Sequence, residues 1–279
     1  MNYSEQEIEE LKEKAREIRR LIIQMLVHAG SGHPGGSLSA VEIMTALFFK
    51  KLNCRPNQID WPERDRVHFS KGHACPLLYA LLSKLGYFPQ EELWNLRKLH
   101  SSLQGHPDRR TPGVEVSSGS LGQGLSVAVG MALAGRLDRR GYKVYCLLGD
   151  GEVQEGEVWE AAMSASFFRL SNLCAILDYN KFQIDGRIRE VMDIEPIVKK
   201  WEAFGWSVIE IDGHNFTQIL SAFETFEAEK EKPTIIVAHT IKGKGVSFME
   251  NVGDFHGRAP TEEEGKRALL ELEVDGERK

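Results

Sequence analysis

The chain has 279 residues, of which 42% are hydrophobic and 27% are charged, and this balance supports a sizeable core and excludes an intrinsically disordered protein. A net charge of −6 argues against a nucleic-acid partner, and no apolar run approaches the length of a membrane span. The four cysteines form no C-x-x-C pair, so we expect buried thiols in a reducing, cytoplasmic protein with no membrane partner.

The N-terminal segment predicts an amphipathic helix. Ser4 and Glu7 have the spacing of a capping box, and apolar residues follow at helical spacing as far as Met25. This helix should end in the glycine-rich stretch 30–36, and a second helix is predicted over 39–51.

Apolar runs and helical stretches alternate through the rest of the chain. The predicted strands cover 66–69, 142–148, 173–178, 206–211 and 234–238, and the predicted helices cover 74–85, 122–135, 158–168 and 215–230. This alternation predicts an α/β fold with a doubly wound, mainly parallel sheet and helices on both faces. We find no repeat or linker, so we expect a single domain over 1–279 with a short polar helical tail from about 260.

Polar side chains follow the ends of the predicted strands. They are His73, Asp150, Asn180, His214 and His239. Since parallel strands end at the same edge of a sheet, these side chains could converge on one ligand.

Gly149-Asp150-Gly151 ends one buried run, and Asn180 follows the next. A carboxylate and an amide oxygen suit Mg²⁺ or Ca²⁺, and Gly151 would let a phosphate approach the backbone closely. Gly-Asp-Gly alone is also a common loop sequence. Together with its flanking strands, the pattern predicts a site for a metal-bound diphosphate.

Several motifs resemble the transketolase family. GDGEVQEGEVWEAAMSAS at 149–166 and DYNKFQIDG at 178–186 are similar to the thiamine-diphosphate motif of these enzymes. The resemblance continues in SGHPGG at 31–36, SKGHACPLLYALL at 70–82, GHP at 105–107, SSGSLGQGLSVAVGMALA at 117–134 and FHG at 255–257. It extends over nearly the whole chain, but only to the N-terminal, diphosphate-binding portion of the family.

The resemblance implies thiamine diphosphate as cofactor, held through Mg²⁺, with Ca²⁺ or Mn²⁺ as alternatives. The implied metal ligands are Asp150, the Asn180 side chain and the backbone carbonyl of Phe182. Gly149 and Gly151 would lie against the diphosphate.

Four loop histidines have implied roles, and each lies next to glycine or proline. His33 and His256 would contact the ketose oxygens, with His256 also touching the cofactor. His106 would lie near the reactive carbon, and His73 at the diphosphate. The remaining histidines are expected to be structural: His28, His68, His100, His214 and His239.

Other implied contacts leave alternatives open. The backbone at Gly119, Ser120 and Leu121 would lie against the cofactor rings, although many family members have proline in place of Ser120. Ile184 and Ile241 would sandwich the thiazolium ring, but ordinary core packing explains apolar residues equally well. Glu155 would join an acidic network across a dimer, whereas a solvated helix face is the alternative for Glu155 and Glu160.

In function, the chain resembles the N-terminal subunit of a split transketolase. Such an enzyme transfers a two-carbon ketol unit from a ketose phosphate to an aldose phosphate. The activating glutamate and most sugar-phosphate ligands would come from a C-terminal transketolase subunit carrying the pyrimidine-binding domain, in a 2:2 heterotetramer. Alternatives are a deoxyxylulose-phosphate synthase-like or dehydrogenase component, and an orphan cofactor-binding module. His33 and His256 favour transketolase.

Overall fold

The computed structural model describes residues 3–184 and 186–274. Helix α1 (Glu5–Ala29) begins at the predicted capping box, in which the Glu7 N–H donates to Ser4 Oγ and the Ser4 N–H donates to Glu7 Oε2. It ends at Gly30, whose φ of 60° is a left-handed conformation that glycine adopts without strain. The first predicted helix is therefore confirmed.

The second predicted helix is divided and begins earlier than expected. Helix α2 (Pro34–Ser39) starts directly after His33, because a proline in the first turn has a suitable φ and needs no hydrogen-bond partner. Ala40 separates α2 from α3 (Val41–Ala46), and a π-helical turn, η1 (Leu47–Lys51), completes the segment. The early start places His33 at the beginning of α2.

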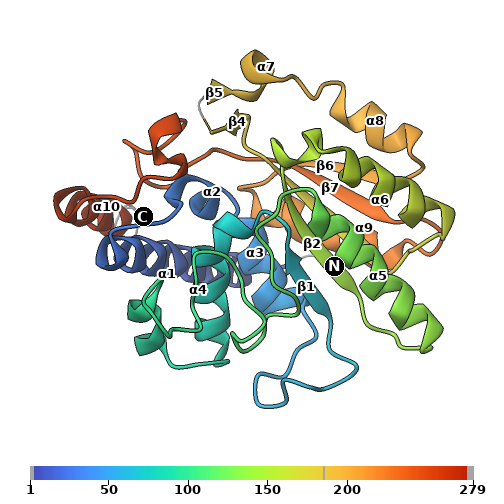
Figure 1. Ribbon diagram of the computed structural model, residues 1–279, viewed down its shortest axis with the longest axis horizontal. Helices are drawn as coiled ribbons and strands as arrows, with labels where there is room; N and C mark the ends of the chain where they lie inside the picture. The colour runs from blue at the N-terminus through green and yellow to red at the C-terminus, as the bar shows by residue number, and fades with distance from the viewer. Residues whose placement is uncertain (1–2, 185, 275–279) are drawn as a thin grey trace.

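One five-stranded parallel sheet forms the centre of the molecule (Figure 1). Its strand order is β1-β2-β3-β7-β6, where the strands are β1 (Arg66–Phe69), β2 (Val144–Gly149), β3 (Leu173–Tyr179), β6 (Ser207–Asp212) and β7 (Thr234–His239). All neighbouring strands in this sheet are parallel. The predicted α/β fold and its strands are confirmed, with boundaries shifted by at most two residues.

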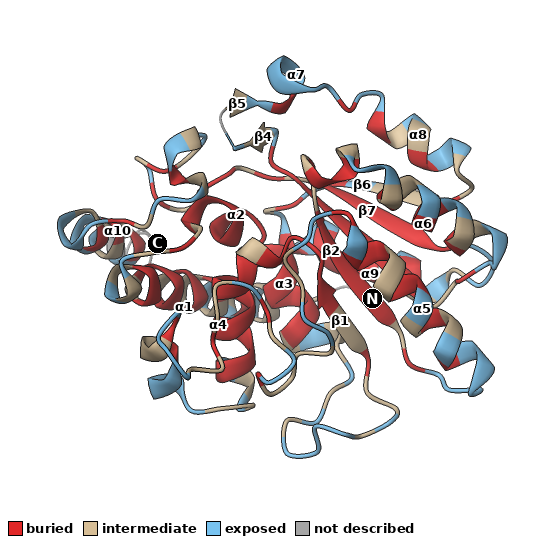
Figure 2. Cartoon of the chain, in the orientation of Figure 1, coloured by how far each residue is buried: buried red, intermediate tan, exposed pale blue. Residues whose placement is uncertain are grey.

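Alternate residues of the central strands β2, β3 and β7 face two separate hydrophobic layers, which accounts for the nearly continuous burial of these strands (Figure 2). Tyr145 and Leu147 pack with α1, α3, α4 (Cys75–Leu85) and α9 (Phe216–Ala228). Val144, Cys146 and Leu148 pack with α5 (Gln123–Leu137), α6 (Gly156–Phe167) and α8 (Ile197–Ala203). Helices thus cover both faces, and the strand ends remain available for a site.

Shorter elements connect these strands and helices. They are η2 (Gly72–Ala74), η3 (Gln90–Asn95), η4 (Glu152–Gln154), the antiparallel pair β4 (Phe182–Gln183) and β5 (Gly186–Arg187), α7 (Ile188–Val191) and η5 (Gly253–His256). The expected C-terminal helix is α10 (Glu262–Val274), which packs on α1. The cysteines are unpaired thiols, three of them buried and Cys54 partly so. Over the described ranges, no helix is both long and apolar enough to cross a bilayer.

Candidate cofactor-binding site

A cavity of about 210 Å³ lies at the carboxyl ends of β2 and β3. Cross-strand pairing of Gly149 with Asp178 brings the segments that follow these strands together. Most of the predicted site residues line the cavity: His73, Leu121, Gly149, Asp150, Gly151, Glu155, Asn180, Phe182, Ile184 and His256. The sheet therefore assembles residues from distant parts of the sequence.

Asp150 and Asn180 are joined through short backbone contacts, as their positions after adjacent strands predict. Asp150 Oδ1 accepts from the Gly151 N–H at 2.8 Å, and Asp150 Oδ2 accepts from the Lys181 N–H at 2.5 Å. Asn180 Oδ1 accepts from the Phe182 N–H at 3.1 Å. The segment 180–182 is thus hydrogen-bonded to Asp150, which places the residues of the three predicted metal ligands close together.

The Asp150 carboxyl group is almost fully buried, with 2% exposure. Burial and the neighbouring charge of Asp178 raise its pKa to about 7, and no basic side chain of the described ranges forms an ion pair with it. A bound divalent cation would offset this cost. Those ranges contain no cluster of three or more His, Cys, Asp or Glu side chains suited to a metal. One carboxylate, one amide oxygen and one carbonyl fit Mg²⁺ when phosphate oxygens and water complete the coordination.

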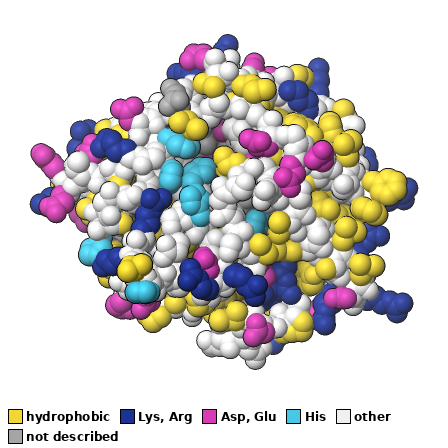
Figure 3. All heavy atoms as spheres, in the orientation of Figure 1, with side chains coloured by type: hydrophobic (Ala, Val, Ile, Leu, Met, Phe, Trp, Pro, Cys, Tyr) yellow, Lys and Arg dark blue, Asp and Glu magenta, His cyan; other side chains and the backbone are white. Residues whose placement is uncertain are grey.

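The four loop histidines form one cluster beside the cavity. The ring centroid of His33 lies 5.3 Å from that of His73, 6.3 Å from that of His106 and 5.7 Å from that of His256, and His73 and His256 are 5.2 Å apart. Figure 3 shows histidine side chains gathered in the central hollow of this face. The sequence predicted their shared role, and the structure brings all four together.

Burial keeps these histidines neutral near pH 7. It lowers the pKa of His33 to about 4, with Arg97 as the next contributor, and that of His256 to about 4, with Lys242 next. Burial also holds the pKa of His73 well below its ordinary value, and that of His106 is lowered in the same way. A neutral imidazole can donate one hydrogen bond and accept another, as a site that binds sugar oxygens requires.

Gly119 permits close packing of its loop against His106. Its φ of 145° favours glycine, and a Cβ there would lie 3.1 Å from the His106 ring. Gly119 and Ser120 lie outside the cavity lining, whereas Leu121 belongs to it.

Two buried lysines of the site were missed by the sequence reasoning. Lys71 follows β1 and Lys242 follows β7, and both line the cavity with about 1% exposure. Lys71 Nζ donates to Asp178, and Lys242 Nζ donates to His256 Nδ1 at 3.0 Å. Both lysines follow the end of a strand, and this is the same sequence pattern that identified the other polar residues of the site.

Lys242 is a buried cation with no carboxylate partner within the part of the chain that the structure describes. Burial lowers its pKa to about 8. An anionic ligand in the cavity would compensate this charge, as a cation would compensate Asp150.

Asp178 connects the strands below the cavity. It accepts hydrogen bonds from Lys71, from Thr240 Oγ1, from Ser39 Oγ at 2.5 Å and from Asn180 Nδ2 at 3.1 Å. Burial would raise its pKa, but Lys71 and these other donors hold it below the ordinary value. The carboxylate therefore stays ionised and fixes the ends of β1, β3 and β7.

The glutamates and isoleucines differ in part from expectation. Glu155 lines the cavity but, like Glu160, is exposed in the single chain. The buried glutamate of this segment is Glu152, which accepts hydrogen bonds from Ser70 Oγ and the Gly122 N–H. Ile184 lines the cavity and is 61% exposed, so the alternative interpretation, that it is an ordinary core residue, is wrong. Ile241 does not line the cavity, and its N–H donates to His214 Nε2.

Two strand-end histidines do not join the cavity. His214 contacts Glu42 at a neighbouring pocket, and His239 Nε2 lies 2.6 Å from Glu210 Oε1. The expectation that all the strand-end side chains converge is therefore wrong for the outer strand β6 and for the last residue of β7.

Comparison with known proteins identifies the family. The family described as "Transketolase, thiamine diphosphate binding domain" matches residues 11–277. The chain belongs to the transketolase family. It is 42% identical to human "Transketolase" over 96% of this chain, but over only 43% of that protein.

Two transketolase relatives are matched over almost their full length. The chain is 48% identical to "6-deoxy-6-sulfo-D-fructose transketolase subunit SqwG" of Clostridium sp. (strain MSTE9), covering 98% of this chain and 99% of the relative. It is 40% identical to an apulose-4-phosphate transketolase subunit of Phocaeicola vulgatus, with 95% of both covered.

Solved transketolases have the same fold. The structure from Campylobacter jejuni superposes with a TM-score of 0.91 at 36% identity, covering 98% of this chain and 43% of that one. The structure from Leishmania mexicana gives a TM-score of 0.90 at 32% identity, covering 94% and 41%.

Proposed function

We propose that the chain is the N-terminal subunit of a two-component, thiamine-diphosphate-dependent transketolase. It would take part in transferring a two-carbon ketol unit from a ketose phosphate to an aldose phosphate. The observation that carries this proposal is one cavity lined by a buried carboxylate and a buried lysine, neither in an ion pair within the described ranges, next to a cluster of neutral histidines.

In this proposal the cavity holds the metal-bound diphosphate. Asp150, the Asn180 oxygen and the Phe182 carbonyl hold Mg²⁺, and Gly149 and Gly151 allow the phosphates to approach. Lys242 offsets phosphate charge, and the neutral rings of His73 and His256 contact the cofactor. The backbone from Gly119 to Leu121 and the side chains of Ile184 and Ile241 contact the rings. When bound, thiamine diphosphate supplies the electron sink for cleavage of the carbon–carbon bond.

His33, His106 and His256 are proposed to act on substrate oxygens. Because Lys242 Nζ donates to His256 Nδ1, the neutral His256 ring carries its proton on Nε2. His256 therefore offers an Nε2–H to a sugar oxygen. His33 and His106 lie on two of the three other loops that reach the cluster.

The proposal includes a C-terminal partner subunit with the pyrimidine-binding domain, in a 2:2 heterotetramer. The relatives from Clostridium sp. and Phocaeicola vulgatus, each matched over 95% or more of its length, are named as subunits, which supports a partner. Hydrophobic side chains also gather over α5 and α6 (Figure 3), where Leu137, Met163, Phe167 and Phe168 are exposed. Such a patch is typical of an interaction surface, and in this arrangement Glu155 faces the dimer interface.

The setting of the enzyme is proposed as well. We propose a single diphosphate-binding domain over 1–279, which agrees with the one continuous sheet. We also propose a cytoplasmic location, which agrees with the unpaired thiols. The sugar-phosphate chemistry agrees with a role in carbohydrate metabolism such as the pentose phosphate pathway.

A ketol-transfer assay tests the proposal. The chain, its partner and their mixture are supplied with thiamine diphosphate, Mg²⁺, an aldose phosphate and one of three donors. The donors are xylulose 5-phosphate, fructose 6-phosphate and 6-deoxy-6-sulfo-D-fructose, the last because a relative is named for it. We expect transfer only by the mixture and only with both cofactors.

Two variants show whether the cavity is responsible. Asp150→Ala should abolish transfer, whereas Asp60→Ala, at an exposed aspartate, should not. Transfer by the chain alone would contradict the two-component proposal. Pyruvate decarboxylation by the mixture would identify a deoxyxylulose-phosphate synthase-like enzyme instead.

A further inference from the structure

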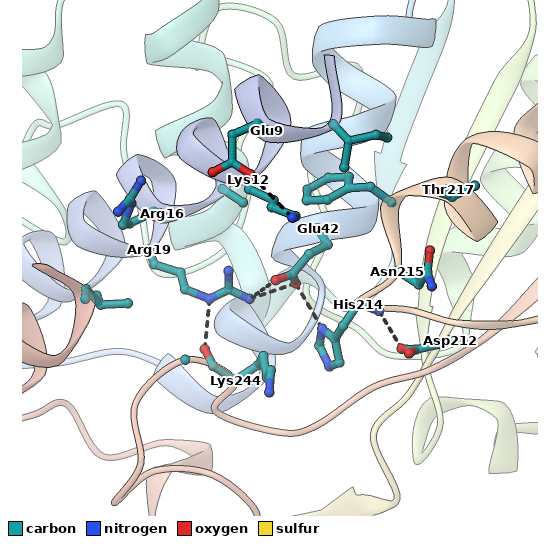
Figure 4. A pocket seen from close by; sticks show the side chains of 15 residues that line it. Glu9, Lys12, Arg16, Arg19, Glu42, Asp212, His214, Asn215, Thr217 and Lys244 are labelled. Atoms are coloured by element: carbon teal, nitrogen blue, oxygen red, sulfur yellow. Dashed lines mark hydrogen bonds and ion pairs between the residues drawn. The ribbon is translucent and has the colours of Figure 1, made fainter. Parts of the chain in front are cut away.

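A second cavity, of about 560 Å³, lies between α1, the turn after β6 and the segment that follows β7 (Figure 4). Three side chains on its wall form a hydrogen-bonded chain. Arg19 Nη2 donates to Glu42 Oε2 at 2.7 Å, and the same oxygen lies 3.0 Å from His214 Nδ1. Arg19 and Glu42 are buried, with 6% and 8% exposure. These three residues are called the Arg–Glu–His network below.

Both ends of the network hold the segment 241–244. His214 Nε2 accepts from the Ile241 N–H at 2.9 Å, and Arg19 Nε donates to the Lys244 carbonyl at 2.9 Å. Since His214 Nε2 accepts, the neutral ring carries its proton on Nδ1 and donates it to Glu42. The direction of every hydrogen bond in the network is thereby determined.

Close packing reinforces this attachment. Gly245 has a φ of 92°, and a Cβ there would lie 2.8 Å from Arg19 Cδ. Gly213, next to His214, approaches Thr240 so closely that a Cβ would lie 2.5 Å from Thr240 Cγ2. The Arg19 side chain and the turn that carries His214 therefore both pack directly against the chain around 240–245.

Lys242 lies between the two attachment points, on the side of the cofactor cavity. Its Nζ reaches His256, and the Gly243 N–H donates to the Gly35 carbonyl at 3.0 Å on that side. Displacement of 241–244 would therefore move the Lys242 ammonium relative to Asp150 and His256, which line the same cavity.

We propose that Arg19, Glu42 and His214 are positioning residues, which hold segment 241–244 so that Lys242 Nζ lies in the cofactor cavity. This inference rests on the proposed function, because it assigns Lys242 to the cofactor diphosphate. A buried ion pair adds little net stability compared with apolar side chains of similar volume, whereas it restricts orientation strongly. The specific consequence of the network is thus the placement of one backbone segment.

The first test is hydrogen exchange of the full chain without cofactor, followed by mass spectrometry of peptides that cover 241–244. His214→Asn retains a donor near Nδ1 but removes the acceptor for the Ile241 N–H, whereas His214→Gln places an acceptor near Nε2. We expect exchange in this segment to rise about tenfold in His214→Asn and clearly less in His214→Gln, because only the former loses the buried hydrogen bond. Equal exchange in wild type and His214→Asn would overturn the proposal.

A matched ion-pair control separates positioning from general stability. Glu42→Gln weakens the network, and Glu115→Gln weakens a similarly shielded pair, Arg64–Glu115, which lines neither cavity. Both variants should unfold at lower temperature. Only Glu42→Gln should raise exchange in 241–244, and an equal rise in both would assign the network to stability alone.

The second test measures cofactor affinity in the complex with the partner subunit. The half-saturating thiamine diphosphate concentration should rise about tenfold in His214→Asn and Glu42→Gln, with less than about twofold change in kcat at saturation. Unchanged affinity in both variants would overturn the link to Lys242. If the wild-type complex itself failed to bind thiamine diphosphate, the proposed function would fail, and the exchange experiment would still judge the attachment of 241–244.

Discussion

Lys242→Met is predicted to stabilise the cofactor-free chain while weakening cofactor binding. Burial lowers the Lys242 pKa from 10.5 to about 8, and each pKa unit corresponds to about 1.4 kcal/mol. The buried charge therefore costs about 3 kcal/mol at pH 7, and removing it also takes one hydrogen bond, worth about 1 kcal/mol, from His256. The net expected gain in unfolding free energy is about 2 kcal/mol, or roughly 5 °C in Tm.

The pH dependence of this gain has a definite sign. Between pH 8 and 10.5 the unfolded chain binds more protons at Lys242 than the folded chain does, so this group makes the wild type more stable as pH rises through that range. The advantage of Lys242→Met should therefore be complete below pH 8 and shrink as pH approaches 10.5. Denaturant unfolding at pH 7 and pH 9.5 measures it.

Cofactor binding should change in the opposite direction. Loss of one charged contact to a phosphate is expected to weaken thiamine diphosphate binding by about 10- to 100-fold, measured by calorimetry on the complex. Lys244→Met is the control, because Lys244 is 32% exposed and paired with Glu250, and its side chain does not line the cofactor cavity. A Lys242→Met chain less stable than wild type at pH 7, or an unchanged affinity, would refute the reasoning.

Further substitutions test three separate parts of the structure. Asn180→Asp keeps an oxygen ligand but adds a negative charge beside Asp178 and the phosphates, so cofactor affinity should fall about tenfold in calorimetry, and an unchanged affinity would count against the metal assignment. Gly124→Ala should lower the unfolding free energy by about 2 kcal/mol, because the new Cβ would lie 2.7 Å from the Ser70 Cα. On the same helix, the Cβ of Gly130→Ala would meet nothing within 4 Å, so this substitution should raise the unfolding free energy by about 0.5 kcal/mol. Equal effects of the two would contradict the packing described. Burial lowers the pKa of His68 to about 4, so between pH 6.5 and 4 the unfolded chain binds a proton at His68 that the folded chain does not. As pH falls through this range, the unfolding free energy of the wild type should drop by up to about 3 kcal/mol more than that of His68→Leu. If denaturation measured at these pH values gave the same drop for both proteins, His68 would not be buried as a neutral imidazole.

The fold and half of the site follow from local patterns. Runs such as Leu173–Tyr179 are apolar because both faces of the sheet are covered, and the polar residues just beyond them identify the ligand edge. Asp150 and Asn180 could therefore be predicted as neighbours. The split between α2 and α3 could not, because the break at Ala40 leaves no mark in the spacing of apolar residues.

The remaining site residues depend on burial, which is a property of the assembled chain. A lysine after a strand is usually solvated, and only the packing of distant segments around the cavity reveals Lys71 and Lys242 as buried. Likewise, Glu152 and Glu155 differ by three positions, and the short turn η4 decides which carboxylate points inward. The partner of His214, Glu42, lies 172 positions away in the sequence.

The central claim is that this chain works as one half of a transketolase, and its native assembly tests that most directly. The chain would be purified gently from its own cell, and the intact mass of the assembly and of each component measured, followed by the ketol-transfer assay on the same sample. We predict a 2:2 complex with a second chain of the C-terminal transketolase type, which transfers ketol units only in the presence of thiamine diphosphate and Mg²⁺. A monomer or homo-oligomer without such a chain, or ketol transfer by this chain alone, would contradict the account.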